Sequence, residues 1–372
     1  MLGPTRPDMR QNRNTILTGW GLHSMNNLAA TIGGRHDFAM SRSGRRENLP
    51  LTALRGVASA WVVGFHVQPL WFPDAPASIA SVLWLGQTAV DIFFGLSGFI
   101  LACVYGGLRL NRAPLFWLRR ICRIYPLHLA VLGTFGGMTL AAVLLHLSHY
   151  SHDWESLCVE ALLVHPFLAD HTPWNPPTWS LGIELLCYTL FPFVARLFGH
   201  ASGWMIAATA IGLAVAELFV QQHGGSTAAH GPVPRGLAGF HLGVALGWLS
   251  PRLRPSLAAP ASLAATAGLV AGITLVSPAA VVLSAAGLIF ALSLEQGPVA
   301  WLLARRGTVW LGRVSFSIYL LHAPLYNLVQ RIPGGHWSHF MLFLAVLLPM
   351  SEVTYRWIER PGRRIPALLM LK

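Results

Sequence analysis

Long apolar runs of about 20 residues, separated by short polar segments, repeat along the chain from residue 52 onward. Such a run is long enough for a helix to cross the hydrocarbon core of a bilayer. The runs lack the strict alternation of polar and apolar positions that is typical of barrel strands. The pattern therefore predicts an all-α fold, a polytopic transmembrane helical bundle of about ten spans. The predicted spans are 52–70, 79–105, 124–147, 179–198, 201–221, 233–250, 258–276, 279–295, 311–330 and 338–359.

Residues 154–168 form a further apolar patch that is short and carries Glu155 and Glu160, with Asp153 directly before it. We interpret this patch as an interfacial or re-entrant helix, because it is too short and too charged to cross the membrane. If it did cross, the orientation of every later span would be inverted.

Composition supports a membrane protein and excludes several other classes. Hydrophobic residues make up 54% of the 372 residues, charged residues 11%, and the mean hydropathy is +0.53. A soluble domain cannot bury that much apolar surface. The four cysteines form neither a CxxC pair nor a zinc-like spacing with histidine, so we predict no disulfide framework and no metal site.

Positive charge is concentrated between the apolar runs. The net charge is +12, and all basic residues except Lys372 are arginines. No basic stripe with interleaved aromatic residues is present, so nucleic-acid binding is not predicted. Alternate loops carry most arginines, as the positive-inside rule requires. The sequence therefore predicts an integral protein of a bacterial-type inner membrane with both termini in the cytoplasm.

The chain divides into three predicted parts. Residues 1–47 are polar, contain seven arginines and no long apolar run, and are predicted to form a disordered cytoplasmic arm without a signal peptide. Met40 is an alternative start. Residues 48–364 form one transmembrane domain, and 365–372 form a cytoplasmic tail.

The first span contains two ionisable residues, Arg55 and His66. They are eleven positions apart, which places them on nearly one helix face and roughly 16 Å apart along the axis. Ionisable side chains inside a bilayer cost several kcal/mol unless they face a partner or a cavity, so both are candidate functional residues. The structural alternative is that Arg55 reaches the interface and His66 hydrogen-bonds a neighbouring helix.

Arg120 and Arg123 lie three residues apart at the predicted cytoplasmic mouth of the third span. Their guanidinium groups share a helix face and suit bidentate phosphate binding, which favours a nucleotide-like ligand from the cytosol. The alternative is a membrane anchor on anionic lipid.

Other polar residues lie within or at the ends of apolar runs. Asp91 in the second span, near Gly95 and Gly98, is interpreted as structural, either paired with an arginine or hydrogen-bonded to a neighbour. Glu184 lies one turn into the fourth span, after Trp179 and Ser180. It could hold His66, an arginine or a sugar hydroxyl, or form an interhelical salt bridge. Late polar faces carry Ser315, Ser317, Tyr319 and His322, and then Tyr355 and Glu359.

Together these motifs resemble the membrane-bound acyltransferase-3 family, whose members O-acylate carbohydrates and some small molecules. The resemblance spans most of the chain. It rests on Arg55 and His66, Phe93–Phe94 with Ser97–Phe99, Arg120 and Arg123, Trp179–Leu181 with Glu184, Arg235–Gly243, Gly312–Pro324 and Tyr355–Pro361. Phe316, Leu321 and Leu185 depart from the family's usual tyrosine, tryptophan and second acidic residue.

The resemblance implies transfer of an acyl group, with acetyl expected, from acyl-CoA to a hydroxyl group. Acyl-CoA is the donor, and no permanently bound cofactor is expected. His66 is then the general base or forms an acyl-histidine, with Arg55 and Glu184 as further catalytic residues. Arg120 and Arg123 hold donor phosphates. Trp179, Ser180, Tyr319 and His322 are the predicted substrate-binding residues.

The resemblance leaves the acceptor open among a carbohydrate, a lipid-linked glycan and a small molecule, and membrane lipid surrounds the protein. A secondary transporter would also use buried Arg, His and Glu, but it predicts an internal repeat that the sequence does not show. If the chain is instead a non-catalytic membrane protein, it should tolerate the substitution His66→Ala.

Overall fold

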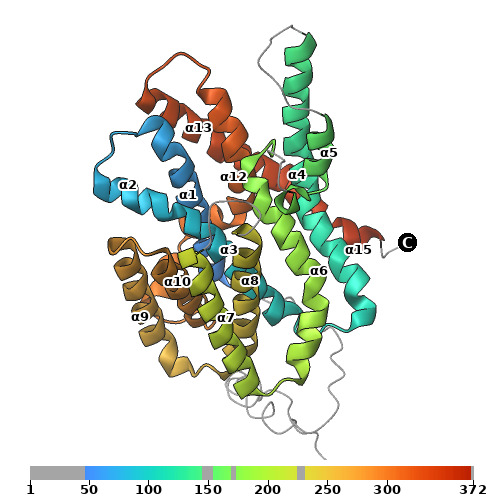
Figure 1. Ribbon diagram of the computed structural model, residues 1–372, viewed down its shortest axis with the longest axis vertical. Helices are drawn as coiled ribbons and strands as arrows, with labels where there is room; N and C mark the ends of the chain where they lie inside the picture. The colour runs from blue at the N-terminus through green and yellow to red at the C-terminus, as the bar shows by residue number, and fades with distance from the viewer. Residues whose placement is uncertain (1–46, 145–153, 169–172, 224–230, 370–372) are drawn as a thin grey trace, which may run out of the picture. The chain divides into compact units, whose positions relative to one another are not determined.

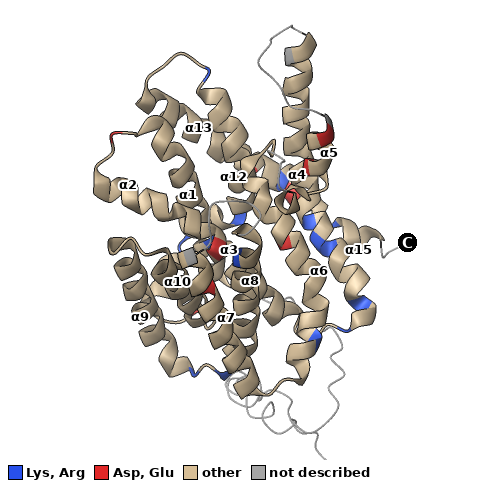
Figure 2. Ribbon diagram, viewed as in Figure 1, with Lys and Arg blue, Asp and Glu red and all other residues tan. Residues whose placement is uncertain are grey.

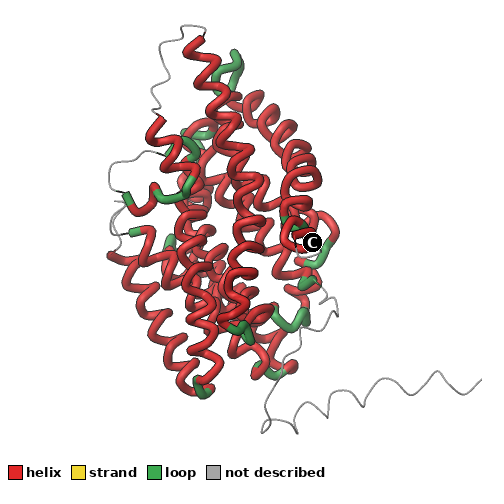
Figure 3. Tube along the Cα trace, turned by 90° about the vertical axis from the view of Figure 1, so that its right-hand side faces the viewer, coloured by secondary structure: helices red, strands yellow, loops and turns green. Residues whose placement is uncertain are grey.

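The computed structural model describes residues 47–144, 154–168, 173–223 and 231–369, and this part of the chain contains helices and no strand (Figure 1). Residues 46–372 form one compact unit. Apart from Glu47, the predicted N-terminal arm lies outside the described residues. Figure 3 shows most of the long helices running in roughly the same direction, as in a bundle.

Every predicted span contains at least one helix, and the end of the third predicted span, 145–147, lies outside the described residues. The longer helices are α1 (Leu49–Trp71), α3 (Ala89–Tyr105), α4 (Ala113–Leu144), α6 (Trp179–His200), α7 (Gly203–His223), α8 (Pro232–Leu249), α9 (Pro255–Thr274), α10 (Pro278–Leu292), α12 (Arg306–Val329) and α13 (His336–Thr354). The shorter ones are α2 (Ala77–Trp84), α5 (Trp154–Ala161), α11 (Pro298–Leu303), α14 (Arg360–Gly362) and α15 (Ile365–Leu369). The patch at 154–168 forms α5 and a 3₁₀ turn, too short to cross a membrane.

Three helices differ from the predicted boundaries. The second span is interrupted by a 3₁₀ turn at Leu85–Thr88, which separates α2 from α3. The helix of the third span begins at Ala113, so the arginine-rich segment before residue 124 is helical too. The tenth span ends in a π-helical turn, Tyr355–Glu359.

Six helical segments of the described chain are long and apolar enough to cross a membrane by length and composition. Helix α10 is apolar but has only 15 residues. Helices α1, α8 and α12 each contain at least one arginine and one histidine, which lowers their hydropathy. Helix α1 packs along α12, and α8 packs along α3. The count of about ten spans therefore stays a prediction.

Glycine contacts bring these central helices close together. A methyl group on Gly98 would overlap the carbonyl of Phe240, and one on Gly243 would overlap the carbonyl of Gly95. A side chain at Gly56 would likewise meet the backbone of Gly312, so α1 and α12 also touch through their main chains. Small residues allow this backbone approach in membrane helices.

A buried ion pair crosses the contact between α3 and α8. Arg235 donates to both carboxylate oxygens of Asp91, at 2.6 and 2.7 Å, and to the carbonyl of Gln87 at 2.8 Å. Gln221 of α7 donates to Asp91 at 3.2 Å and to Glu217 at 2.9 Å. Asp91 thus pairs with an arginine, one of the two structural roles predicted for it. Figure 2 shows such charged residues in the interior, whereas further basic residues lie at the lower ends of α4 and α6.

Candidate active site

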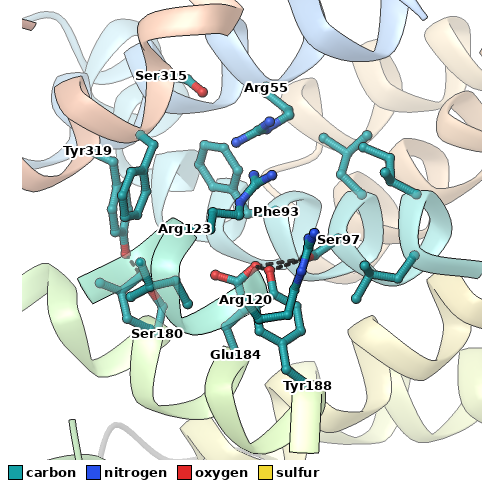
Figure 4. Close-up of a pocket in the computed structure, with 16 residues that line it drawn as sticks. Arg55, Phe93, Ser97, Arg120, Arg123, Ser180, Glu184, Tyr188, Ser315 and Tyr319 are labelled. Atoms are coloured by element: carbon teal, nitrogen blue, oxygen red, sulfur yellow. Dashed lines mark hydrogen bonds between the residues drawn. The ribbon is translucent and has the colours of Figure 1, made fainter. Parts of the chain in front are cut away.

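A cavity of about 70 Å³ lies where α1, α3, α4, α6 and α12 meet (Figure 4). Its lining combines apolar side chains with charged and hydroxyl-bearing side chains. The polar residues that line it are Arg55, Ser97, Arg120, Arg123, Ser180, Glu184, Tyr188, Ser315 and Tyr319. Most of the residues predicted to be functional therefore surround one space.

Helical spacing places these groups on the cavity side. Ser180, Glu184 and Tyr188 are four residues apart along α6 and share one face. Arg120 and Arg123 share a face of α4 in the same way. The close contact of Gly56 with Gly312 holds the arginine of α1 beside the polar face of α12. Each helix contributes one polar strip to the site.

Glu184 is the carboxylate of the cavity, and two hydroxyl groups hold it. The Ser97 hydroxyl donates to its Oε1 at 2.7 Å, and the Tyr188 hydroxyl donates to the same oxygen. Figure 4 shows the carboxylate pointing into the cavity. Of the partners predicted for Glu184, neither His66 nor an arginine is its hydrogen-bond partner within the described chain.

The three arginines of the cavity are held differently. Arg120 lies over the rings of Tyr105, Phe116 and Tyr188, with its guanidinium carbon 5.4, 5.7 and 5.8 Å from their centroids. Arg55 and Arg123 extend their guanidinium groups into the cavity (Figure 4). No carboxylate of the described chain lies within ion-pairing distance of either.

One further ion pair lies beside these arginines. Glu359, on the π-helical turn, accepts a hydrogen bond from Ser317 at 3.2 Å and pairs with Arg363. Glu359 is also within electrostatic range of Arg55 and Arg123. With Arg55, Arg120, Arg123 and Arg363 against two carboxylates, the formal charge around the cavity is positive. Such a site favours an anionic ligand.

His66 does not line this cavity but lies next to His322. Nε2 of His322 is 3.3 Å from Nδ1 of His66, and the ring centroids are 4.9 Å apart. Nδ1 of His322 is 2.7 Å from the carbonyl of Tyr319, and Nδ1 of His66 is 3.0 Å from that of Val62. A carbonyl only accepts, so both Nδ1 atoms carry protons. Nε2 of the neutral His66 ring therefore holds a lone pair.

Tyr319 connects the cavity with the two histidines. Its hydroxyl donates to the carbonyl of Pro177 at 2.9 Å and lies 2.8 Å from the Ser180 hydroxyl. Its ring lines the cavity, and the centroid is 6.0 Å from that of His322. Tyr319 thus lines the cavity of the arginines and also lies beside His322, which contacts His66.

Trp179 stays apart from both groups. The centroid of its ring is 6.2 Å from that of the Phe94 ring, and Trp179 does not line the cavity. Two lining residues, Ser97 and Tyr188, were not singled out as site residues from the sequence. Tyr188 could have been found by its spacing of four residues from Glu184 on α6, whereas the partner of Ser97 depends on how α3 crosses α6.

A buried carboxylate outside the predicted spans holds the start of α6. The Thr178 hydroxyl donates to Glu160 at 2.5 Å, and Nδ1 of His165 lies 3.3 Å from the other carboxylate oxygen. Burial raises the pKa of Glu160 to about 7, although hydrogen bonds from Thr178 and from backbone groups of Asn175 and Trp174 lower it. Asn175 donates to the Leu320 carbonyl of α12 at 3.1 Å, which links this segment to the helix of Tyr319 and His322.

Comparison with curated proteins identifies several relatives. Acyltransferase MdmB of Streptomyces mycarofaciens is 28% identical over 368 residues, covering 85% of this chain and 93% of the relative. Protein 2 in the picA locus of Rhizobium radiobacter is 29% identical over 195 residues, 48% of this chain and 98% of that protein. A provisionally named O-acetyltransferase of Staphylococcus aureus is 21% identical over 357 residues, 84% of this chain and 57% of its own length.

No solved structure matches the chain. The family model described as an acyltransferase domain, acyltransferase-3, matches residues 49–354. This match covers most of the chain, including both histidines and all the residues that line the cavity. The protein therefore belongs to the acyltransferase-3 family and is an acyltransferase.

Proposed function

We propose that the protein is an integral membrane O-acyltransferase that moves an acyl group, with acetyl expected, from acyl-CoA to a hydroxyl of a carbohydrate or related acceptor. The proposal is carried by a cationic cavity lined by Tyr319, whose ring lies beside the His322–His66 contact, in a chain of this family. The contact of His66 Nδ1 with the Val62 carbonyl assigns the ring proton to Nδ1, so Nε2 is the nitrogen that can act as the base. The staphylococcal relatives, which are provisionally named O-acetyltransferases, favour an oxygen acceptor and the acetyl group.

The chemistry requires a base, because a sugar hydroxyl is a weak nucleophile at neutral pH. Nε2 of His66 takes the hydroxyl proton while the oxygen attacks the thioester carbonyl. When the tetrahedral intermediate collapses, the carbon–sulfur bond breaks, the ester forms, and the CoA thiolate receives the proton from the imidazolium. An acyl-histidine route would use the same nitrogen as the nucleophile.

His322 orients the base in this proposal. Its Nδ1 proton is directed to the Tyr319 carbonyl, so its Nε2 lone pair faces the Nδ1 proton of His66. The contact favours the ring tautomer of His66 that leaves Nε2 available, a role that a carboxylate plays in catalytic triads. His322 is thus a positioning residue rather than the base.

The arginines hold the donor. Arg120 and Arg123 line the cavity beside Arg55, and their charge suits the phosphates of acyl-CoA. Arg55 lies on the same helix as His66, nearer to the N-terminal end of α1. The pantetheine arm of the donor would then pass Tyr319 to bring its thioester to His66. Glu184 would bind acceptor hydroxyls or the donor through the oxygen that the Ser97 and Tyr188 hydroxyls leave open.

The proposed location is a bacterial-type inner membrane with both termini in the cytoplasm. The arginine-rich connection before α4 then faces the cytosolic pool of acyl-CoA, and the segment before α6 lies on the far side. The acceptor would be a carbohydrate, a lipid-linked glycan or a small molecule.

The test uses the full-length protein in lipid nanodiscs with isotopically labelled acetyl-CoA. Extracts of glycans and small molecules from a strain lacking the gene serve as acceptors, and mass spectrometry identifies any acetylated product. We expect an ester product that depends on the protein and on acetyl-CoA. Turnover of neither acetyl-CoA nor longer acyl-CoA donors with any extract, by protein that is folded, would contradict the proposal.

A further inference from the structure

A second cavity, of about 480 Å³, opens beside the connection between α3 and α4. It is lined by the residues that directly follow α3 and by the C-terminal part of α6, and both α3 and α6 also line the first cavity. Leu101 of α3 lines the first cavity and Gly106, directly after α3, lines the second; on α6 the corresponding residues are Tyr188 and Ala195. At 1.5 Å per residue these steps are about 8 and 11 Å along the helices. The second cavity therefore lies further along α6 than the first, on the side away from Ser180.

The lining of the second cavity is basic. Arg109, Arg196 and His200 contribute cationic or hydrogen-bonding groups, Asn111 contributes an amide, and no carboxylate belongs to the lining. Arg196 and His200 are one turn apart at the end of α6. Nδ1 of His200 is 2.7 Å from the Arg196 carbonyl, so its Nε2 remains available to a ligand. The C-terminal end of a helix disfavours anions, but the full charges of two arginines exceed this partial charge.

The two cavities differ in volume as well as in position. A nucleotide occupies a pocket of several hundred Å³, which the first cavity, at about 70 Å³, does not provide. The second cavity, at about 480 Å³, is large enough. A donor that carries a nucleotide at one end and a thioester at the other would therefore need both.

We infer that the second cavity binds the adenosine 3′-phosphate end of the acyl donor, with the phosphate between Arg109 and Arg196. This inference rests on the proposed function. The 5′-diphosphate then lies nearer Arg120 and Arg123, and the pantetheine arm follows the shared face of α3 and α6 into the first cavity. The same chemistry, a phosphate monoester or diester between two arginines, is also offered by an anionic lipid headgroup.

The test compares CoA with dephospho-CoA, which lacks the 3′-phosphate, as ligands of the full-length protein in phosphatidylcholine nanodiscs. The variant is Arg109→Ala combined with Arg196→Ala, both exposed positions. The matched control is Arg112→Ala, an exposed arginine of the same connection that does not line the cavity. Calorimetry gives the dissociation constants, and circular dichroism checks the fold.

We expect wild type to bind CoA more tightly than dephospho-CoA. The double variant should bind CoA about tenfold or more weakly, because a charge-assisted contact to the phosphate is lost. It should bind dephospho-CoA as wild type does, and Arg112→Ala should change neither constant. An equal loss for both ligands, or no loss, overturns the inference.

A second arm separates the lipid from the donor. If Arg109 and Arg196 serve a lipid headgroup, the double variant loses thermal stability in phosphatidylglycerol nanodiscs and retains wild-type CoA affinity in phosphatidylcholine, which overturns the inference. If wild-type protein turns over acetyl-CoA and the double variant binds CoA as wild type does, this inference is wrong and the proposed function stands. Wild-type protein that binds no CoA removes both.

Discussion

Two sets of buried charges lie within the same bundle and are satisfied in opposite ways. Between α3 and α8, Arg235 makes two hydrogen bonds to Asp91 and a third to a backbone carbonyl. Around the first cavity, Arg55 and Arg123 have no carboxylate within ion-pairing distance in the described chain. A buried arginine whose donors are used by the protein fixes packing, whereas one whose donors face a cavity is available for a ligand.

The charge balance extends this comparison. At the α3–α8 contact, Asp91 pairs with Arg235, and Gln221 of α7 bridges Asp91 and Glu217. Close glycine contacts between α3 and α8 follow further along both helices, and neither Asp91 nor Arg235 lines the two cavities described. The cavity has more arginines than carboxylates, an arrangement that favours an anionic ligand. Under the proposed function, arginine would therefore serve stability in one place and binding in the other.

The largest expected effect concerns the histidine pair. His66→Gln keeps hydrogen-bonding capacity but removes the base, so turnover should fall by about 10²–10⁴-fold while CoA affinity stays at the wild-type value. Initial rates of acetyl transfer and calorimetry in nanodiscs measure both. In wild type, activity should fall as pH drops through the pKa of His66, because the neutral ring is required. A Gln variant with near wild-type turnover would make His66 structural and His322 the next candidate base.

His322 allows a sharper test of the same pair. His322→Gln retains a side-chain acceptor for the Nδ1 proton of His66 beside the Val62 carbonyl, whereas His322→Leu leaves the carbonyl alone. We expect the Gln variant to recover most of the activity that the Leu variant loses, with KM for the donor equal in both. Equal loss in both variants would show that His322 does more than orient His66.

The next effect concerns stability at the α3–α8 contact. Asp91→Ala leaves Arg235 buried without its carboxylate and should lower the free energy of unfolding by about 3–5 kcal/mol. Arg55→Ala, at the cavity, should cost much less and instead weaken CoA binding. Thermal unfolding in detergent and CoA titrations compare the two. The distinction between the two sets of charges fails if Arg55→Ala destabilises the fold as much as Asp91→Ala.

A smaller effect is expected at Arg123. Arg123→Ala should weaken acyl-CoA binding about tenfold, and Arg123→Lys should recover part of it, because lysine restores the charge without the bidentate fork. Arg120 is held by three aromatic rings, so its replacement by alanine should also lower stability. Unchanged CoA affinity in Arg123→Ala would favour the alternative that this arginine contacts lipid.

Much of the fold could be predicted from the sequence, because apolar length alone marks a membrane helix. The 3₁₀ break at Leu85–Thr88 was missed, since it lies inside a continuous apolar run. The start of α4 at Ala113 was missed because the first turns of this helix are rich in arginine and therefore do not belong to an apolar run. Hydropathy indicates which residues suit the lipid environment, but it does not show where a helix begins outside that environment.

The candidate site could be predicted only as a set of residues. Helical periodicity placed Arg55 and His66 on nearly one face, but in the structure Arg55 lines the cavity whereas His66 contacts His322, whose ring lies beside Tyr319. Whether Glu184 contacts a histidine, an arginine or two hydroxyls depends on how α3 and α6 cross, which no single helix encodes. The contact between the two histidines, from helices 256 positions apart, was equally beyond the sequence.

The smallest effect, a change in pH dependence, concerns a third kind of buried charge. Among the residues that the structure describes, Glu160 has no arginine within ion-pairing distance, unlike Asp91, and it lines neither of the two cavities, unlike Glu184; its ionisable contact is His165. Burial raises its pKa from 4.5 to about 7, so the folded state binds a proton that the unfolded state has released between these values. Its contribution to the free energy of unfolding is therefore full below pH 4.5, declines as pH rises, and is lost above about pH 7.

Glu160→Gln replaces the acid by a neutral side chain of the same shape and removes this titration. The unfolding temperature of the variant, relative to that of wild type at the same pH, should therefore be higher at pH 8 than at pH 5. Other groups titrate in both proteins and cancel in this difference. Glu155→Gln, an exposed acid of the same helix, is the control and should give a constant difference. A constant difference for Glu160→Gln as well would contradict this prediction. It would mean that Glu160 stays ionised in the folded protein over this pH range, held by its contact with His165.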